Sequence, residues 1–299
     1  MEKNTKPKPS AKGLSGKPNR NNKYEHHNDI KSNPLTPFKT RKSANCRTAT
    51  CNWHDNLELL YVTGGNGTVR CGTRNIEMLP ESVIIINSQT MHSISSEDGV
   101  DYCMYIIDNS FFRENGIDVT GCTFENVSSD ERLINVCREV YNVSVSEKGP
   151  LYNARLRAAF LALVLELCEN HMLNISENKK EGSCSEQYVK KAMEYINDNY
   201  TEKINLEGIA KVIGINKSYF AREFRKYAGQ TVHTYINSLR CAMADRCLAE
   251  GMSVTEAAME SGFGTLSYFS RTYKKLRGFS PVSAKEQSYG ASVLQSGGM

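Results

Sequence analysis

The pattern of apolar and polar positions changes twice along this chain of 299 residues. Between residues 44 and 108, short apolar runs such as 57–62, 83–86 and 102–107 alternate with turns rich in glycine and asparagine. Short apolar runs bounded by turn residues are typical of strands, and strands at this spacing predict a small sandwich or barrel. A barrel of this size either fills its interior with side chains or holds one small ligand.

After residue 130 the apolar positions recur at helical spacing. The first stripe consists of Leu133, Val136, Cys137 and Val140. A second helix is expected over residues 151–170, and it is apolar on nearly every side between residues 158 and 168. Such a helix needs partners on more than one face, so we expect the barrel on one side and a second subunit on the other. The segment 133–170 is therefore predicted to form a homodimer interface.

Near the end of the chain, one amphipathic stretch occurs twice. Residues 218–229 read SYFAREFRKYAG, and residues 267–278 read SYFSRTYKKLRG. Both copies have apolar residues at i, i+4 and i+7, followed by a glycine suited to a helix C-cap. The opposite faces carry the basic residues Arg222, Arg225, Lys226, Arg271, Lys274 and Lys275. The pattern predicts two helices, each with a basic face.

Each copy follows a shorter predicted helix and a turn that contains glycine. The first short helix, residues 206–213, has Asn205 as its N-cap and precedes the turn Gly214-Ile215-Asn216. The second begins with Ser253 and Glu256, which form a capping box, and ends near Gly262. A helix, a short turn and a basic second helix together are typical of the helix-turn-helix motif.

Between the two units, residues 231–250 read as one helix of about 20 residues, or about 30 Å in length. One turn of B-DNA measures roughly 34 Å, so the two basic helices are placed to enter the major groove twice on one face. A single chain would then do what a dimer of helix-turn-helix proteins does. Ala221 corresponds to Ser270, and the second turn is one residue longer, so we expect the two helices to read different bases.

Charge separates the chain into parts with different tasks. Residues 1–43 carry 11 basic and 3 acidic side chains. Residues 44–185 carry 11 basic and 19 acidic side chains, and residues 186–299 carry 15 basic and 11 acidic side chains. The basic C-terminal part indicates a nucleic-acid partner, and the acidic middle a different role. We expect a disordered basic tail over residues 1–43, a linker over 174–186 and a flexible tail over 287–299. The first tail either adds non-specific attraction to DNA or is only a solvated leader.

The sequence also indicates where the protein acts. It contains no apolar run long enough to span a bilayer and no apolar core of a secretory signal, which predicts a cytoplasmic location. Ten cysteines occur without any CxxC pair, so we expect reduced, packed thiols rather than a disulfide framework or a zinc site.

The C-terminal motifs carry a resemblance to a known family. Residues 187–286 resemble the DNA-binding domain of the AraC/XylS family of bacterial transcriptional regulators, and the middle resembles that family's cupin-like effector domain. The most specific motif in this resemblance is Gly262-Phe263…Ser267-Tyr268-Phe269-Ser270-Arg271…Lys274-Lys275…Gly278-Phe279-Ser280-Pro281. The resemblance implies an α+β protein of two domains. Residues 44–173 would form a cupin-like β-barrel with a helical dimerisation segment, and residues 187–286 an all-α double helix-turn-helix domain.

The resemblance also implies a function. The expected protein is a transcription factor and not an enzyme. It is expected to respond to a small-molecule effector, to bind double-stranded DNA and, if it is an activator, to contact RNA polymerase. Expected DNA contacts are Lys217, Ser218, Tyr219, Ala221, Arg222, Arg225, Leu266, Ser267, Tyr268, Arg271 and Lys274. Arg222 and Arg271 are the leading candidates for base contacts, because a guanidinium can read guanine bidentately. The alternative for both is a phosphate contact or a salt bridge within the domain.

A second group of residues lies in the predicted barrel. Asn52, His54, Glu58 and His92 resemble the metal-ligand spacing of catalytic cupins, but Asn52 stands where the first histidine belongs. We expect Trp53, His54, Glu58 and His92 to line an effector pocket, with neither metal nor cofactor. Two alternatives remain: these residues stabilise the barrel only, or the three N/O donors hold a metal in a cupin enzyme tethered to a DNA-binding domain.

Overall fold

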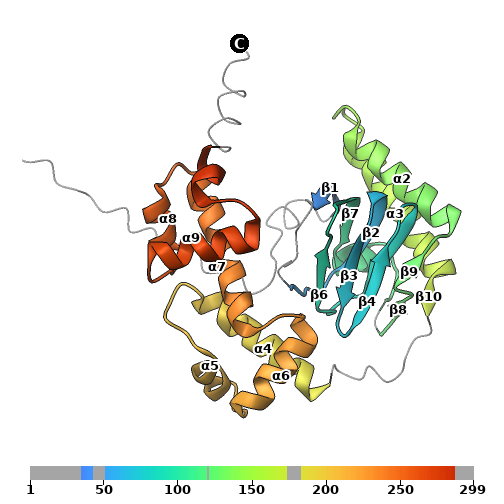
Figure 1. Ribbon diagram of the computed structural model, residues 1–299. Helices are drawn as coiled ribbons and strands as arrows, with labels where there is room; N and C mark the ends of the chain where they lie inside the picture. The colour runs from blue at the N-terminus through green and yellow to red at the C-terminus, as the bar shows by residue number, and fades with distance from the viewer. Residues whose placement is uncertain (1–34, 43–50, 120, 174–182, 287–299) are drawn as a thin grey trace, which may run out of the picture.

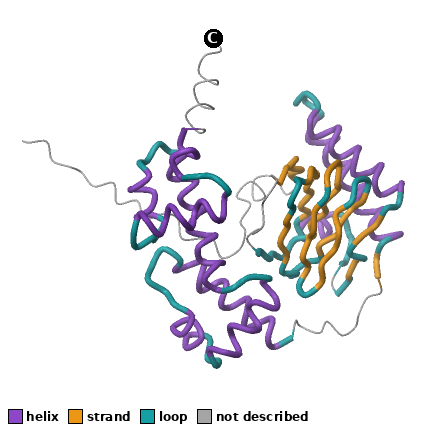
Figure 2. The backbone as a smooth tube through the Cα atoms, viewed as in Figure 1, coloured by secondary structure: helices purple, strands orange, loops and turns teal. Residues whose placement is uncertain are grey.

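The structure is a computed structural model that describes residues 35–42, 51–119, 121–173 and 183–286. It has a β-sheet-rich N-terminal part and an all-helical C-terminal part (Figure 1), and the same division is visible when helices and strands are coloured apart (Figure 2). The α+β fold with two domains is therefore confirmed. Within the described ranges, no helix is long and apolar enough to cross a membrane.

The strands of the N-terminal domain are antiparallel. They are β1 (Leu35–Lys42), β2 (Leu57–Gly65), β3 (Gly67–Cys71), β4 (Arg74–Met78), β5 (Ser82–Ile86), β6 (His92–Ser95), β7 (Val100–Ile107), β8 (Thr123–Phe124), β9 (Val127–Ser128) and β10 (Met172–Leu173). One sheet has the order β1-β7-β2-β5-β9, a second has the order β4-β3-β6, and β8 pairs with β10.

The central strands of the five-stranded sheet, β2, β5 and β7, are largely buried on both faces. Along β2, Leu60 and Val62 pack against strands of the smaller sheet, whereas Leu59 and Tyr61 point to the opposite face. That opposite face is covered by the helices α2 (Glu131–Val145) and α3 (Tyr152–Asn170), with the short α1 (Asn109–Glu114) beside them. Because alternate side chains of a strand point to opposite faces, burial of both faces requires the continuous apolar runs seen in the sequence.

Strand β1 corrects one prediction. Residues 1–43 are predicted to be a disordered tail, yet residues 35–42 pair along their whole length with β7, from Leu35 opposite Ile107 to Lys42 opposite Val100. The stretch contains few apolar residues, so its composition carries no strand signal. The backbone of β7 provides the hydrogen-bonding partners, and this pairing across more than 50 residues of sequence is not visible in local pattern. Residues 1–34 lie outside the described residues.

The C-terminal domain contains two helix-turn-helix units. Its helices are α4 (Cys184–Asn199), α5 (Leu206–Val212), α6 (Lys217–Ala228), α7 (Val232–Ala249), α8 (Val254–Glu260) and α9 (Leu266–Arg277). One core joins α4, α5 and α6 to the start of α7, and another joins the rest of α7 to α8 and α9. Helix α7 thus connects the two units, as Figure 1 shows and as its sequence predicts.

The helix ends follow the sequence signals closely. Asn205 and Asn216 accept hydrogen bonds from backbone N–H groups at the starts of α5 and α6, and Ser253 with Glu256 forms the predicted capping box of α8. One boundary differs from the prediction. Helix α4 begins at Cys184, inside the predicted linker 174–186, because Ser183 caps it by accepting the N–H of Glu186. Residues 174–182 of that linker and the predicted tail 287–299 lie outside the described residues.

Candidate nucleic-acid interface and sensor cluster

The two repeated helices, α6 and α9, are oriented by one buried stripe each. In α6, Phe220 and Phe224 are fully buried, and in α9, Phe269 and Tyr273 take the equivalent positions. Each helix ends at a glycine in the left-handed region, Gly229 or Gly278, which a side chain would strain. With these faces fixed inward, the opposite faces of both helices are exposed to solvent.

The outward faces carry the residues predicted to contact DNA. Those that are exposed are Lys217, Ser218, Arg222, Arg225, Leu266, Ser267, Arg271 and Lys274. Ala221, Tyr219 and Tyr268 are half-buried. The structure therefore groups the predicted residues on two surfaces, one per helix, with cationic side chains at the exposed positions. A surface of this kind attracts a nucleic-acid backbone.

The two leading arginines differ in their surroundings. The Arg222 side chain is 70% exposed, donates to the carboxylate of Glu223 at 3.1 Å, and lies over the ring of Tyr219. Arg271 is exposed and has neither a hydrogen bond nor an ion pair to any described residue. Arg222 therefore forms a salt bridge within its own helix, whereas Arg271 has no such pair among the described residues.

Tyr219 of α6 and Tyr268 of α9, which occupy equivalent positions of the repeat, bind to neighbouring helices through their hydroxyl groups. The hydroxyl of Tyr219 lies 2.7 Å from Ser185 Oγ at the start of α4. The hydroxyl of Tyr268 accepts from Asn237 at 2.8 Å and lies 2.9 Å from His233 Nε2, both on α7. Each tyrosine hydroxyl therefore holds its helix, α6 or α9, against another helix of the domain.

Glu223 contacts two of the basic residues of α6, and the sequence did not indicate it as a site residue. It is buried on the inner side of α6, accepts from Arg222, and lies 3.7 Å from the ammonium of Lys226. A buried carboxylate between two basic residues orients both of them. The sequence gives its position in the helix but not the burial of its carboxylate, which depends on packing.

In the N-terminal domain, the structure brings together three of the four predicted sensor residues. His54 Nε2 lies 2.9 Å from Glu58 Oε2, and His92 Nε2 lies 3.2 Å from the same oxygen. The Nδ1 atoms of the two histidines point to the carbonyl oxygens of Asn56 and Thr90. All three side chains are buried, so the set forms a closed polar cluster, which we call the sensor cluster.

The two histidines of the sensor cluster lower the pKa of its carboxyl group, Glu58. Burial by itself raises the pKa of Glu58, but the adjacent imidazoles of His92 and His54 more than reverse this effect. The net result is a pKa well below the usual range of a glutamate, so Glu58 is anionic at neutral pH. A buried carboxylate between two imidazoles offers N and O donors to a polar ligand or a cation.

The fourth predicted sensor residue, Trp53, lies elsewhere. It is 8% exposed and belongs to the same apolar cluster as Val189 and Met193 of α4, together with Cys51 and Met91. The ammonium of Lys190 on α4 lies over the indole ring, 5.1 Å from its centroid. Trp53 therefore contacts the C-terminal helical domain, while His54, its neighbour in sequence, belongs to the sensor cluster.

A second contact joins the domains at the end of α6. Arg70 of β3 donates from its guanidinium to the backbone carbonyl of Lys226 in the last turn of α6. A Cβ placed on Gly229, the C-cap of that helix, would lie 2.9 Å from Arg70 Cδ. A cation at a helix C-terminus is favourable because the carbonyl ends carry partial negative charge. No sequence signal indicated Arg70, since its partner lies 156 residues away.

Two family models match the chain, and they match different domains. Residues 44–167 match the AraC-like ligand binding domain, and residues 209–287 match a helix-turn-helix domain. An uncharacterised HTH-type transcriptional regulator from the cgkA 5' region of Pseudoalteromonas carrageenovora is 30% identical over 124 residues, which are 40% of this chain and 74% of that protein. The protein belongs to the AraC family of transcriptional regulators and combines a ligand-binding domain of that family with a helix-turn-helix DNA-binding domain.

Other similar proteins cover more of the chain. The HTH-type transcriptional activator Btr of Bacillus subtilis is 26% identical over 222 residues, 73% of this chain, although the chain spans only 42% of the length of Btr. Among solved structures, ToxT from Vibrio cholerae aligns over 85% of this chain and 98% of its own, with a TM-score of 0.47 and 15% sequence identity.

Proposed function

We propose that this protein regulates transcription in the cytoplasm by reading two adjacent major-groove segments with α6 and α9, and that an effector bound in its N-terminal domain controls this binding. The observation that carries the proposal is the pair of exposed basic helices connected by α7. With 18 residues, α7 is about 27 Å long, and this length is comparable to one turn of B-DNA.

Within each of the two helices, we assign different residues to base contacts and to phosphate contacts. Arg271 and Arg222 are placed for base contacts, whereas Lys217, Arg225 and Lys274 position the protein on phosphates. Ala221 and Leu266 offer apolar contact to a thymine methyl group. Because the exposed residues of α6 and α9 differ, one subunit reads an asymmetric site.

The proposed effector site is the sensor cluster. Asn52 exchanges two backbone hydrogen bonds with His92, at 2.8 and 2.9 Å, so a shift of His92 moves residues 51–53. Trp53 in that segment packs on α4 of the DNA-binding domain. A ligand that binds one arrangement of the two domains better than another would change DNA binding through this connection.

Helix α3 supports a homodimer. Ala158, Ala162 and Leu165 are exposed at i, i+4 and i+7, and Leu165 is 44% exposed, so an apolar stripe remains on the face turned away from the sheet. A second copy of the helix would cover it. RNA polymerase is the expected further partner if the protein acts as an activator.

The experiment begins with selection of duplexes from a random library by the full-length protein, followed by footprinting on the enriched sequence. Two protected major-groove segments about one helical turn apart are expected. Insertion of about five base pairs between them turns the second segment to the opposite face, so affinity should fall to the non-specific level. Protection of one segment only, or affinity unchanged by the insertion, would contradict binding of both α6 and α9 to the major groove.

The effector is tested separately on the same full-length chain. A thermal-shift screen against metabolites should reveal a ligand that raises the unfolding temperature, because binding to the folded state stabilises it. The shift should disappear in His92→Gln and persist in His233→Gln, which alters a histidine of the DNA-binding domain. A ligand whose shift survives His92→Gln binds outside the sensor cluster and would refute this assignment.

A further inference from the structure

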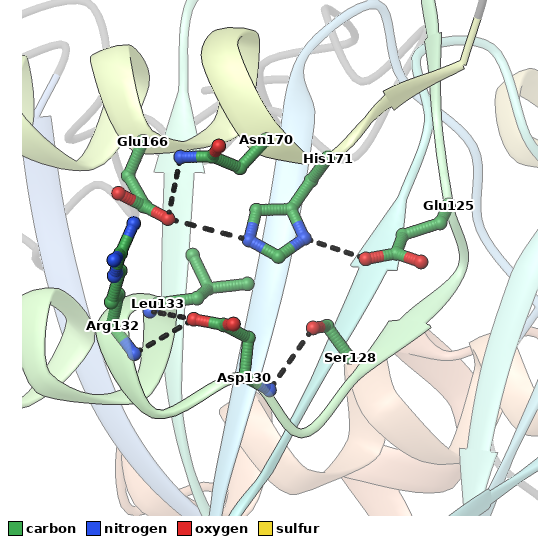
Figure 3. Close-up of polar contacts among 8 residues, drawn as sticks. All are labelled: Glu125, Ser128, Asp130, Arg132, Leu133, Glu166, Asn170 and His171. Atoms are coloured by element: carbon green, nitrogen blue, oxygen red, sulfur yellow. Dashed lines mark hydrogen bonds and ion pairs between the residues drawn. The ribbon is translucent and has the colours of Figure 1, made fainter.

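A second cluster of titratable residues lies in the helical layer of the N-terminal domain, apart from the sensor cluster. Figure 3 shows His171 at the end of α3, with Glu166 on the same helix, Asp130 at the start of α2, and Glu125 between β8 and β9. One donor atom each from Asp130, Glu166 and His171 lies within 4.8 Å of the others. Two stretches that are distant in sequence, residues 125–130 and 166–171, therefore place N and O donors around one point.

The imidazole of His171 is held in a defined orientation. Its side chain is 5% exposed, and Nδ1 lies 2.6 Å from Oε1 of Glu125, a distance typical of a charge-assisted hydrogen bond. The backbone supports this contact, because the N–H of Glu125 donates to the carbonyl of His171 and β8 pairs with β10 on either side. With its Nδ1 proton directed to Glu125, the imidazole presents the Nε2 lone pair to the opposite side.

Nothing in the described part of the chain satisfies that second nitrogen. His171 Nε2 is buried and has no hydrogen-bond partner there. The nearest acidic atom, Glu166 Oε1, lies 3.7 Å away, beyond hydrogen-bond length. A lone pair that faces a carboxylate oxygen across this gap is unfavourable, and a cation between the two atoms removes the repulsion.

The separation fits a metal ion better than a proton. Bonds of about 2.1 Å from an ion to Nε2 and to Oε1 would span the gap with an angle of about 120° at the ion. Asn170 donates to the same Oε1 at 3.0 Å and so orients the carboxylate of Glu166. Asp130 is exposed, which gives a hydrated ion a route to the site.

We propose that His171, Glu166 and Asp130 bind a divalent transition-metal ion of the Zn²⁺ type, with Glu125 as the carboxylate that orients the histidine. One imidazole with two carboxylates is a donor set for borderline ions such as Zn²⁺ rather than for Ca²⁺ or Mg²⁺, which prefer oxygen ligands alone. A carboxylate on the far ring nitrogen is the usual support of a metal-binding histidine. The ion would connect the start of α2, the end of α3 and the β8–β9 segment.

The sensor cluster differs from this site. There, Glu58 already lies 2.9 and 3.2 Å from the two histidines, at direct hydrogen-bond distances, and all three residues are buried. The two clusters must nevertheless be distinguished in any metal measurement. The variant His92→Gln serves this purpose, because it alters the sensor cluster only.

The test measures Zn²⁺ uptake by the full-length protein after treatment with a chelator, using equilibrium dialysis and metal analysis. His171→Gln and Glu166→Gln should each lower the Zn²⁺ stoichiometry by one equivalent relative to the wild type. Glu125→Gln should keep the equivalent but weaken its affinity by about 10- to 100-fold. The matched control Glu169→Gln, an exposed carboxylate on the same helix, should leave both unchanged.

Folding is monitored in parallel by circular dichroism and thermal unfolding. Zn²⁺ should raise the unfolding temperature of the wild type, of His92→Gln and of Glu169→Gln, but not that of Glu166→Gln. If His171→Gln does not fold, Glu166→Gln decides the question, because its carboxylate is 15% exposed and does not belong to the apolar core. Equal stoichiometry and affinity in the wild type and Glu166→Gln would overturn the proposal, as would loss of the ion in His92→Gln alone.

Discussion

Arg271→Ala tests the base-reading role of the second recognition helix. The side chain is exposed and has no partner among the described residues, so its removal should change the free energy of unfolding by less than about 0.5 kcal/mol. A bidentate contact to a base contributes about 1–3 kcal/mol of discrimination. Its loss corresponds to a decrease in affinity of roughly 5- to 150-fold for the selected duplex.

The assay is a fluorescence-anisotropy titration of the selected duplex and of duplexes with single base changes. Arg271→Ala should lose its preference at one base pair while the salt dependence stays as in the wild type. The control Lys274→Ala, three residues further on the same face, should weaken binding to all sequences alike and reduce the salt slope by about 0.9. If Arg271→Ala behaves like Lys274→Ala, or leaves affinity unchanged, Arg271 does not read a base.

Three further predictions concern the core, the sensor cluster and the dimer. Phe224→Ala removes a fully buried ring packed against Phe220 and Tyr235 and should cost about 3–5 kcal/mol in urea unfolding; a loss below about 1 kcal/mol would contradict the packing. Because the pKa of Glu58 is lowered on folding, its contribution to stability is present above about pH 4.3 and is lost as the pH falls below it. The decrease in unfolding free energy between pH 5 and 3 should therefore be smaller in Glu58→Gln, and equal decreases would refute the assignment. If α3 forms the proposed dimer, Leu165→Glu should give a monomer in light scattering, whereas Glu169→Gln, also at an exposed position of α3, should leave the dimer intact.

The C-terminal domain was largely predictable because its signals are local. Caps such as Asn216, C-cap glycines such as Gly229 and the apolar stripe of α6 all lie within one helix, so short-range spacing defines the start, the end and the buried face. The repeat in α9 adds an independent copy of the same signals. Helix α4 began earlier than predicted only because Ser183 provides a cap inside a polar stretch.

For the sensor cluster, the sequence indicated three of the residues that meet but not which contacts they make. His54, Glu58 and His92 do meet, and the four-residue spacing of the first two made part of this visible in the sequence. Trp53 was expected beside them but packs on α4, because adjacent residues of an extended segment point in opposite directions. Which direction faces the other domain is a property of domain packing.

By itself, the sequence determined the class of this protein: a β-rich domain, two basic helix-turn-helix units and the helix that connects them, all encoded in periodicity, caps and charge. Only the tertiary structure decided the contacts between segments far apart in the chain. It placed β1 along β7, Arg70 at the end of α6, and His171 between Glu125 and Glu166. The reason is physical: local spacing determines which face of an element is apolar, whereas a long-range polar contact forms only where packing brings two such elements together.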